Sequence, residues 1–246
     1  MAVLVTRPGQ QGQTLCQQLN DGGINSLHQP LIQFSSGREL ASLPTKIGQF
    51  DVIIAVSQHA VSFSSQTLIS SNQDWPECQY VAVGQKTAQD LSKVCGQKVH
   101  YPETSDSEHL LQLPLLNKVK GKKVLILRGN GGRELIFDTL CQRGARVEYL
   151  ETYKRENIRF NSRFLVPIWK TKGIKQLIIT SSGQLVYFVS QVAEEFHNWL
   201  FQLQLYVPSK RIAEEARDIG FTSIVNTEGA SNKDLLAALK PNKQDD

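Results

Sequence analysis

The sequence is poor in cysteine, in long apolar runs and in clustered charge. Its cysteines, Cys16, Cys78, Cys95 and Cys141, form no Cys-x-x-Cys pair and no other metal-ligand spacing, which argues against a zinc site or a disulfide framework. No apolar run approaches the roughly 18–20 residues of a membrane-spanning helix, so we expect no membrane partner. The net charge is +4 and the lysines and arginines are scattered, which makes nucleic acid a poor candidate for a partner.

The chain also shows no secretory leader. Met-Ala-Val-Leu-Val at its start has the pattern of a strand, without a charged segment or a cleavage site, so we expect a cytoplasmic protein. Along its 246 residues, 40% of them hydrophobic, strand and helix patterns alternate. This alternation predicts an α/β protein with one large or two small domains.

The clearest local pattern covers residues 121–155. Residues 124–127 are an apolar, β-rich run, and a glycine-rich turn follows at residues 128–132. Apolar side chains at near-helical spacing then predict a helix that a glycine terminates, and residues 147–153 read as a second strand. In this βαβ unit the turn brings Arg128, backbone N–H groups and a helix N-terminus together, which favours an anion.

The same plan opens the chain and continues through both halves. A strand, an arginine-containing turn, a helix and a second strand come first, and Arg7 corresponds to Arg128 at an offset of 121 residues. Further along, the strand that ends in Ser57 resembles the strand that ends in Ser181, at an offset of 124 residues. We interpret this as a duplication of whole domains rather than a solenoid. Taken alone, the pattern predicts two contiguous halves divided near residues 117–120.

Local signals refine the expected elements. The strand after the first helix is expected to run as one element to Phe34. Ser105, with Glu108 three residues later, forms a predicted capping box at a helix start. Residues 157–171 are expected to be irregular, as is the polar tail at residues 241–246.

Two domains that each contain a parallel sheet carry their ligand sites outside the carboxyl ends of the strands. If those ends face one another, the loops after six strands line one cleft, which is the expected site. These loops follow Val5, Val56, Val83, Leu127, Thr180 and Val207.

Several segments together resemble uroporphyrinogen-III synthases over nearly the whole chain. The most specific is the stretch at residues 121–155, with GKKVLILRGNGGRE and RGARVEYLETYKR. The others are VTRP, DVIIAVSQHAV, VAVGQKTA, SEHLLQL, IITSS and PSKRIAEEARDIGF, and they come in the order seen in that family.

The resemblance implies two similar, flavodoxin-like parallel-sheet domains joined by a two-stranded linker. Domain 1 comprises residues 1–36 and 154–246, domain 2 comprises residues 37–153, and the substrate cleft lies between them. It also implies a lyase of tetrapyrrole (haem, sirohaem or cobalamin) biosynthesis that acts as a monomer without cofactor or metal. The family's reaction cyclises hydroxymethylbilane to uroporphyrinogen III, with inversion of ring D and loss of water. Transient handover of the substrate from hydroxymethylbilane synthase is a further expectation.

Tyr153 matches the tyrosine that proposals for the family favour as the proton donor. Phenols have an ordinary pKa of about 10, so they stay protonated near neutrality and can donate to a departing hydroxyl. The alternative is a tyrosine that only packs on the two-stranded linker.

The candidate substrate-binding residues follow strands, where hydroxyls, amides and cations can hold carboxylates. They are Arg7, Ser57, Thr87, Arg128, Gly129, Gly131, Ser181, Ser182, Ser209 and Lys210. For the arginines and glycines the alternative is a structural ion pair in a tight turn, and for the serines it is N-capping of the next helix. The histidines show no triad or ligand spacing, although His59 is placed to line the cleft.

A second class of function also fits these residues, namely a two-domain binding protein that closes on an anionic small molecule without turnover. The missing export signal counts against the periplasmic proteins of that class. A nucleotide-dependent oxidoreductase is a third possibility, and it is disfavoured because Glu134 stands where the GxGxxG fingerprint needs glycine.

Overall fold

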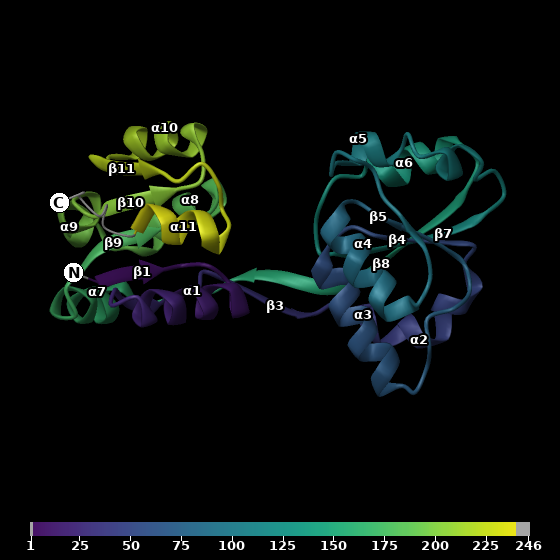
Figure 1. The fold of residues 1–246 in the computed structure, drawn as a ribbon, viewed down its shortest axis with the longest axis horizontal. Helices are drawn as coiled ribbons and strands as arrows, with labels where there is room; N and C mark the ends of the chain where they lie inside the picture. Colours follow the sequence, from purple (N-terminus) through teal and green to yellow (C-terminus); the bar gives the residue numbers. More distant parts are fainter. Residues whose placement is uncertain (1, 240–246) are drawn as a thin grey trace. The chain divides into compact units, whose positions relative to one another are not determined.

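The apolar runs form the strands of two separate sheets. The computed structural model describes residues 2–239, and the chain divides into two compact α/β units (Figure 1). Unit 1 contains Met1–Gln33 and Glu156–Asp246, and unit 2 is Phe34–Arg155. The chain passes from one unit to the other within β3 (Ile32–Ser36) and β8 (Arg146–Asn157), which are hydrogen-bonded neighbours. A two-stranded linker therefore joins the units and the first of them is discontinuous, which confirms the predicted fold class.

Unit 1 is built on a five-stranded sheet with the order β11-β10-β9-β1-β2, and all of its registered strand pairs are parallel. Its strands are β1 (Ala2–Val5), β2 (Asn25–His28), β9 (Ile174–Ile178), β10 (Gln204–Val207) and β11 (Ser223–Asn226). β1 is buried along its whole length. Because side chains alternate along a strand, Val3 and Val5 pack together on one face, in a core with Leu15, Leu19 and Leu235.

Helices of unit 1 cover its sheet. α1 and α11 contribute the leucines named above to the core around Val3 and Val5. Outside that cluster, Trp169 of α7 stacks on Phe188 of α8 with 6.0 Å between the ring centroids. The helices are α1 (Gly9–Asp21), α7 (Ser162–Thr171), α8 (Ser182–Gln191), η4 (Glu194–Phe196), α9 (His197–Phe201), α10 (Lys210–Ile219) and α11 (Asn232–Leu239).

Unit 2 is built on a six-stranded sheet with the order β3-β8-β7-β4-β5-β6, in which the pairs from β8 to β6 are parallel. Its remaining strands are β4 (Val52–Ala55), β5 (Gln79–Ala82), β6 (Val99–His100) and β7 (Lys123–Gly129). Its helices are η1 (Leu40–Ser42), α2 (Leu43–Lys46), η2 (Ile47–Gln49), α3 (Gln58–Ser70), α4 (Gln85–Cys95), α5 (Ser107–Leu110), η3 (Pro114–Asn117) and α6 (Leu135–Gln142). Ile53 and Leu125 pack in the core beneath α2–α4, and Ile54 and Ile126 pack in the core beneath α5 and α6.

The two sheets have the same order when they are read from β2 and from β8. That order is β2-β1-β9-β10-β11 in unit 1 and β8-β7-β4-β5-β6 in unit 2. Within this shared five-strand order, each sheet takes two strands from one half of the sequence and three from the other half, and β3 is an additional edge strand in unit 2. Periodicity alone predicts two contiguous halves divided near residues 117–120. The structure differs, because the first two strands of each half join the sheet formed by the other half.

Two local predictions are wrong, one about a strand that contains a proline and one about the N-cap of a helix. The single strand expected to reach Phe34 is two strands, β2 and β3, which belong to different sheets; Pro30 lies between them and has no N–H to continue a ladder. Helix α5 takes Asp106 rather than Ser105 as its N-cap, because the Asp106 carboxylate accepts the backbone N–H of His109 at 2.7 Å.

Residues 157–171, which were expected to be irregular, contain helix α7. The side chain of Asn161 caps this helix by accepting the N–H of Phe164 at 3.3 Å, and the helix buries Val166 and Trp169. The predicted irregular tail at residues 241–246 lies outside the described residues. Between residues 2 and 239, no helix combines the length and the apolar character that crossing a membrane requires.

Candidate functional site

The carboxyl edge of each sheet carries an arginine beside a capped helix. In sheets of this order, ligands bind where neighbouring strands connect in opposite directions, between β1 and β9 in unit 1 and between β7 and β4 in unit 2. Arg7 follows β1 and Ser181 follows β9, while Arg128 lies at the end of β7 and Ser57 follows β4. The duplicated halves therefore place equivalent side chains at both switch points.

Arg7 is a buried cation held by neutral groups. Its side chain donates from Nη1 to Asn232 Oδ1 and from Nη2 to Gln11 Oε1, both at 2.6 Å, and only 9% of the residue is exposed. Its Nε atom is buried without a hydrogen-bond partner, and no carboxylate of residues 2–239 lies within ion-pair distance. Burial lowers the pKa of Arg7. A buried guanidinium without a counter-ion suits an incoming carboxylate.

Arg128 has the same place in unit 2 and already has an acidic partner. Its Nη1 donates to Glu134 Oε1 at 2.9 Å, its Nη2 donates to the Gly132 carbonyl at 3.2 Å, and its guanidinium lies 4.2 Å from the Tyr149 ring centroid. The Tyr149 hydroxyl donates to the other Glu134 oxygen at 2.6 Å. Hydrogen bonds from Tyr149 and Arg128 lower the pKa of Glu134, while burial and the Glu134 carboxylate raise the pKa of Tyr149. Tyr149 and Arg128 thus stabilise the charged form of Glu134.

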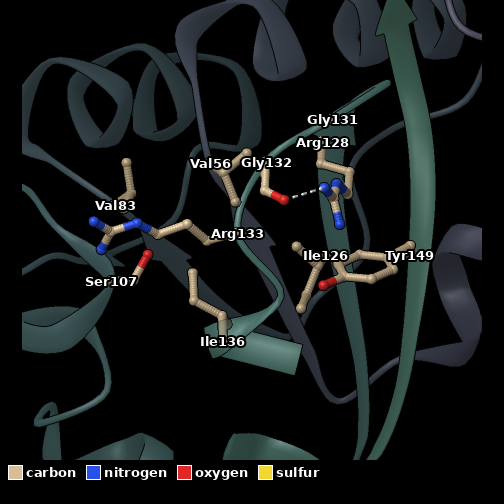
Figure 2. A pocket seen from close by; sticks show the side chains of 10 residues that line it. All are labelled: Val56, Val83, Ser107, Ile126, Arg128, Gly131, Gly132, Arg133, Ile136 and Tyr149. Atoms are coloured by element: carbon tan, nitrogen blue, oxygen red, sulfur yellow. Dashed lines mark hydrogen bonds between the residues drawn. The ribbon is translucent and has the colours of Figure 1, made fainter. Parts of the chain in front are cut away.

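A pocket of about 180 Å³ opens beside this cluster in unit 2. Its walls are mainly apolar, with Ser107, Arg128 and Arg133 as its hydrogen-bonding side chains; the apolar side chains are Val56, Val83, Ile126, Ile136 and the Tyr149 ring. Figure 2 shows Arg128 and Tyr149 on one side of the pocket and Arg133 with Ser107 on the other. Apolar walls with cations at the rim suit an apolar ring that carries carboxylates.

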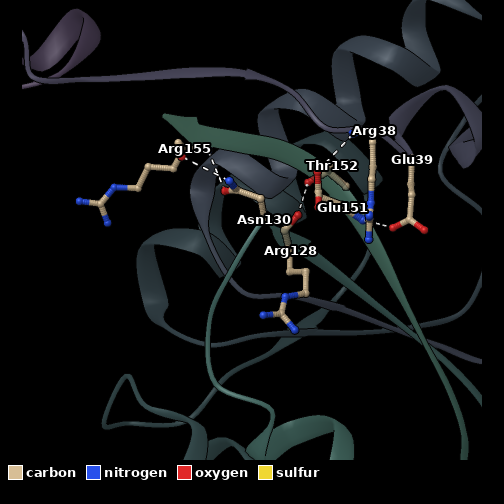
Figure 3. A network of polar contacts seen from close by, with 7 residues as sticks. All are labelled: Arg38, Glu39, Arg128, Asn130, Glu151, Thr152 and Arg155. Carbon is tan, nitrogen blue, oxygen red and sulfur yellow. Dashed lines mark hydrogen bonds and ion pairs between the residues drawn. The ribbon is translucent and has the colours of Figure 1, made fainter. Parts of the chain in front are cut away.

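The end of β7 is locked to β8 by side chains that extend the ladder. Asn130 donates to the Arg155 carbonyl at 3.3 Å and accepts the Arg155 N–H at 2.9 Å (Figure 3). The Thr152 hydroxyl is buried and donates to the Arg128 carbonyl at 3.1 Å. Between Arg128 and Gly129 the register shifts, because Arg128 lies opposite Glu151 while Gly129 lies opposite Tyr153. This is a β-bulge, a feature that re-aims the side chains beside it.

Tyr153 lies against three aromatic side chains of unit 2. Its ring centroid is 5.8 Å from that of Phe34, 5.6 Å from that of His59 and 6.2 Å from that of Phe63, and the Phe34 and His59 rings stack at 3.7 Å. Partial burial lowers the pKa of His59. Ser57 Oγ lies 3.1 Å from the Tyr153 hydroxyl oxygen. Tyr153 is thus held on a packed platform and remains partly exposed.

The other candidate residues have more varied surroundings. Ser181 and Ser209 cap α8 and α10, accepting N–H groups three residues later at 3.3 and 3.4 Å. Ser182 accepts a hydrogen bond from Arg211 at 2.9 Å, and Lys210 is exposed. Thr87 is only 6% exposed in the first turn of α4, so it faces the interior.

The two glycines differ from each other. Gly131 lines the pocket, and a methyl group there would meet nothing within 4 Å. At Gly129, a methyl carbon would lie 2.7 Å from the Tyr153 ring, so Gly129 makes room for that ring.

Four residues of this cluster were not predicted as site residues: Ser107, Arg133, Glu134 and Tyr149. A signal for Arg133 and Glu134 was present, because both follow Gly131-Gly132 directly and share the βα turn. No sequence signal pointed to Tyr149, because its contacts with Arg128 and Glu134 depend on the pairing of β7 with β8. Within the described part of the chain, no group of three or more His, Cys, Asp or Glu residues is placed to hold a metal ion.

The fold and the site define a class of two-domain α/β protein. Its two flavodoxin-like units are joined by two strands, and each unit carries an arginine at its switch point. Within that class the chain belongs to the uroporphyrinogen-III synthase family. The family described as uroporphyrinogen-III synthase HemD matches residues 13–237. The chain is 40% identical over 246 residues to uroporphyrinogen-III synthase of Escherichia coli (strain K12), which covers 98% of this chain and 100% of that protein.

Further relatives agree in sequence and in fold. The uroporphyrinogen-III synthase of Salmonella typhimurium is 38% identical over 98% of this chain and 100% of its own. Among solved structures, a mutant uroporphyrinogen III synthase from the extremely thermophilic bacterium Thermus thermophilus superimposes with a TM-score of 0.61 at 16% identity, covering 96% of both chains. Uroporphyrinogen-III synthetase from Helicobacter pylori 26695 gives 0.53 at 17% identity, covering 87% of this chain and 91% of its own. These structures show that the fold is shared.

Proposed function

We propose that this protein is a uroporphyrinogen-III synthase, a lyase that cyclises hydroxymethylbilane to uroporphyrinogen III with inversion of ring D and loss of water. The observation that carries the proposal is the 40% identity to an enzyme of that name over 98% of the chain. The chemistry at the carboxyl edges of the sheets supports it, because a linear tetrapyrrole combines apolar rings with many carboxylates. The reaction is redox-neutral, so no redox cofactor belongs to the proposal.

The proposed role of the two arginines is to hold substrate carboxylates. Arg7 offers a buried guanidinium with a free Nε, and Arg128 offers one at the rim of an apolar pocket. The N-termini of the helices capped by Ser57, Ser181 and Ser209 add backbone N–H groups of favourable polarity. Several carboxylates held at once leave a flexible chain few conformations, which favours attack at the substituted carbon of ring D over unassisted closure.

The proposed role of Tyr153 is to supply the proton that the departing hydroxyl needs. The C–O bond of the hydroxymethyl group breaks, and water leaves with the phenol proton. The substituted carbon of ring D attacks the remaining cation and forms a spiro intermediate. The bond from that carbon to its original methylene bridge then breaks, and the bridge bonds to the unsubstituted carbon of ring D, which inverts the ring. The proton that this last carbon loses as the ring regains aromaticity returns to the phenolate, so the balance closes. The aromatic side chains around Tyr153 would shield the cation from stray water.

Further parts of the proposal concern the surroundings of the enzyme. We place it in the cytoplasm as a monomer that receives its unstable substrate transiently from hydroxymethylbilane synthase. The cysteines are all free thiols in the structure, which fits a reducing compartment.

Product analysis tests the proposed function directly. Purified protein is incubated with freshly prepared hydroxymethylbilane, and the products are oxidised and separated as porphyrin isomers. Spontaneous closure has no reason to invert ring D, whereas a site that uses binding energy from remote carboxylates does. We expect the type III isomer to dominate. A mixture equal to the protein-free control, despite tight binding of the tetrapyrrole, would support the anion-binding protein instead.

Glu134 competes with the substrate for Arg128 in this proposal, so Glu134→Gln should tighten binding. Ion pairs with an exposed carboxylate are weak because solvent screens them, so we expect only a modest decrease in Kd, of about 1.5- to fivefold. Fluorescence titration with uroporphyrin III, the oxidised product, measures the change. The control is Glu195→Gln, which removes the exposed pair with Arg163 in unit 1. Weaker binding to Glu134→Gln would mean that Glu134 holds Arg128 in its binding position.

A further inference from the structure

In the structure, Ser57 is the donor in its hydrogen bond to Tyr153. Ser57 Oγ accepts the backbone N–H of Ala60 at 3.1 Å as the N-cap of α3, and its hydroxyl donates to the Tyr153 oxygen, also at 3.1 Å. A serine hydroxyl has one proton to donate. Since that proton goes to the phenol oxygen, the phenol's own proton is left to point elsewhere.

The β-bulge places Tyr153 where Ser57 can reach it. Leu150 lies in the core beneath α2–α4, whereas Tyr149 packs against the core on the other face. Strict alternation would put a residue three positions after Leu150 on the opposite face from it. Tyr153 nevertheless packs against the same core as Leu150. The extra residue at Thr152, whose hydroxyl bonds the Arg128 carbonyl, accounts for this reversal.

Gly129 completes the support from the other strand. A methyl carbon at this position would lie 2.7 Å from two ring carbons and 3.0 Å from the hydroxyl oxygen of Tyr153. The φ angle of Gly129 is not in the left-handed region, so contact with the ring is the specific requirement for glycine here. The ring is therefore bounded by Gly129 and by the aromatic side chains, and its hydroxyl is bounded by Ser57.

We infer that Ser57 is a positioning residue for Tyr153, rather than a direct substrate ligand, and that Gly129 serves the same end. The inference rests on the proposed function, in which Tyr153 donates a proton. Ser57 occupies the acceptor side of the phenol oxygen and so directs the transferable proton outward. It also stabilises the phenolate that remains after transfer.

Variants at position 57 separate this role from helix capping. Ser57→Gly removes the donor and weakens the cap only slightly, because glycine is also a favourable N-cap, while Ser57→Thr keeps both functions. We expect Ser57→Gly to lower kcat about five- to tenfold with KM unchanged, as for loss of one hydrogen bond to a developing charge. Ser57→Thr should restore kcat to within about twofold, as its hydroxyl can make the same bonds. Gly129→Ala should lower kcat with KM unchanged, because the ring must shift.

The capping control is Asn161→Gly, which alters the cap of α7 in unit 1. It should lower the free energy of unfolding by the same small amount as Ser57→Gly and leave kcat unchanged. The decisive measurement is a double-mutant cycle. In a Tyr153→Phe background, Ser57→Gly should have no further effect on kcat, because the group that it positions is gone.

Several outcomes would overturn the inference. A rise in KM with kcat unchanged would make Ser57 a substrate ligand, and equal effects of Ser57→Gly with and without Tyr153 would make its role independent. An unchanged kcat in Ser57→Gly would remove any role. The wild-type protein distinguishes these outcomes from failure of the proposed function. If the proposed function is wrong, wild type gives no excess of the type III isomer.

Discussion

Tyr153→Phe lowers turnover by no more than about 100-fold, and the type III isomer stays the main enzymic product. General acid catalysis contributes about 10²- to 10⁴-fold, and a reaction governed by positioning draws on the lower end of that range. The variant loses the proton and keeps the ring, so the packing with Phe34, His59 and Phe63 is retained. Single-turnover kinetics with freshly prepared hydroxymethylbilane, followed by isomer separation, measures both quantities.

The matched control is Tyr187→Phe. The Tyr187 hydroxyl is buried without a hydrogen-bond partner in the described structure, so its removal costs no hydrogen bond and should leave turnover unchanged. Complete loss of activity in a folded Tyr153→Phe protein would show that proton donation outweighs positioning. A shift towards the other isomer would show that the phenol also helps to orient ring D.

The equivalence of Arg7 and Arg128 is visible in the sequence, whereas their partners are not. Both arginines follow an apolar strand at the start of a repeated pattern, and the structure places both at the carboxyl edge of a sheet. Glu134 lies six residues from Arg128 and could be suspected from the turn. Asn232, which holds Arg7, is 225 residues away. A contact over that separation depends on packing of α11 beside α1, which local patterns do not encode.

The division into units shows the same limit. Strand and helix types follow from apolar runs and glycine stops, which act over a few residues. The choice of sheet partners is made by the pairs β1–β9 and β4–β7, which join strands from opposite halves of the chain. The sequence shows the same repeat whether the strands of each half pair with one another or with strands of the other half. For this reason the discontinuous unit followed from family resemblance and not from the repeat.

The orientation of the Tyr153 side chain is a further feature that the sequence pattern does not predict. Alternation along residues 147–153 would place its side chain on the face of Tyr149, and one inserted residue moves it to the face of Leu150. A bulge is a property of two paired strands, and it depends here on the Thr152 hydroxyl and on Asn130. Tyr153 itself could be chosen from the family pattern. Its neighbours Ser57, Gly129 and Phe34 come together only through the fold.

Two helical glycines give opposite results when each is replaced by alanine. Helix propensity alone predicts that both changes stabilise, by roughly 0.4–1 kcal/mol. Gly183 in α8 has open space around it, with nothing within 4 Å of an added methyl group, so Gly183→Ala should follow propensity. Gly12 in α1 is buried, and an added methyl carbon would overlap the Arg7 carbonyl oxygen and the His28 ring. We therefore expect Gly12→Ala to lower the free energy of unfolding by about 3 kcal/mol.

The clash at Gly12 is severe because neither neighbour can yield cheaply. His28 Nε2 and the Arg7 carbonyl oxygen are hydrogen-bonded to each other at 2.7 Å, so moving either breaks a bond at the end of β1. Urea unfolding followed by circular dichroism measures both variants against wild type. A stabilised Gly12→Ala protein would show that α1 can shift away from β2 at little cost. The free energies of unfolding of the two variants should differ by more than propensity can explain, since steric overlap at Gly12 opposes it.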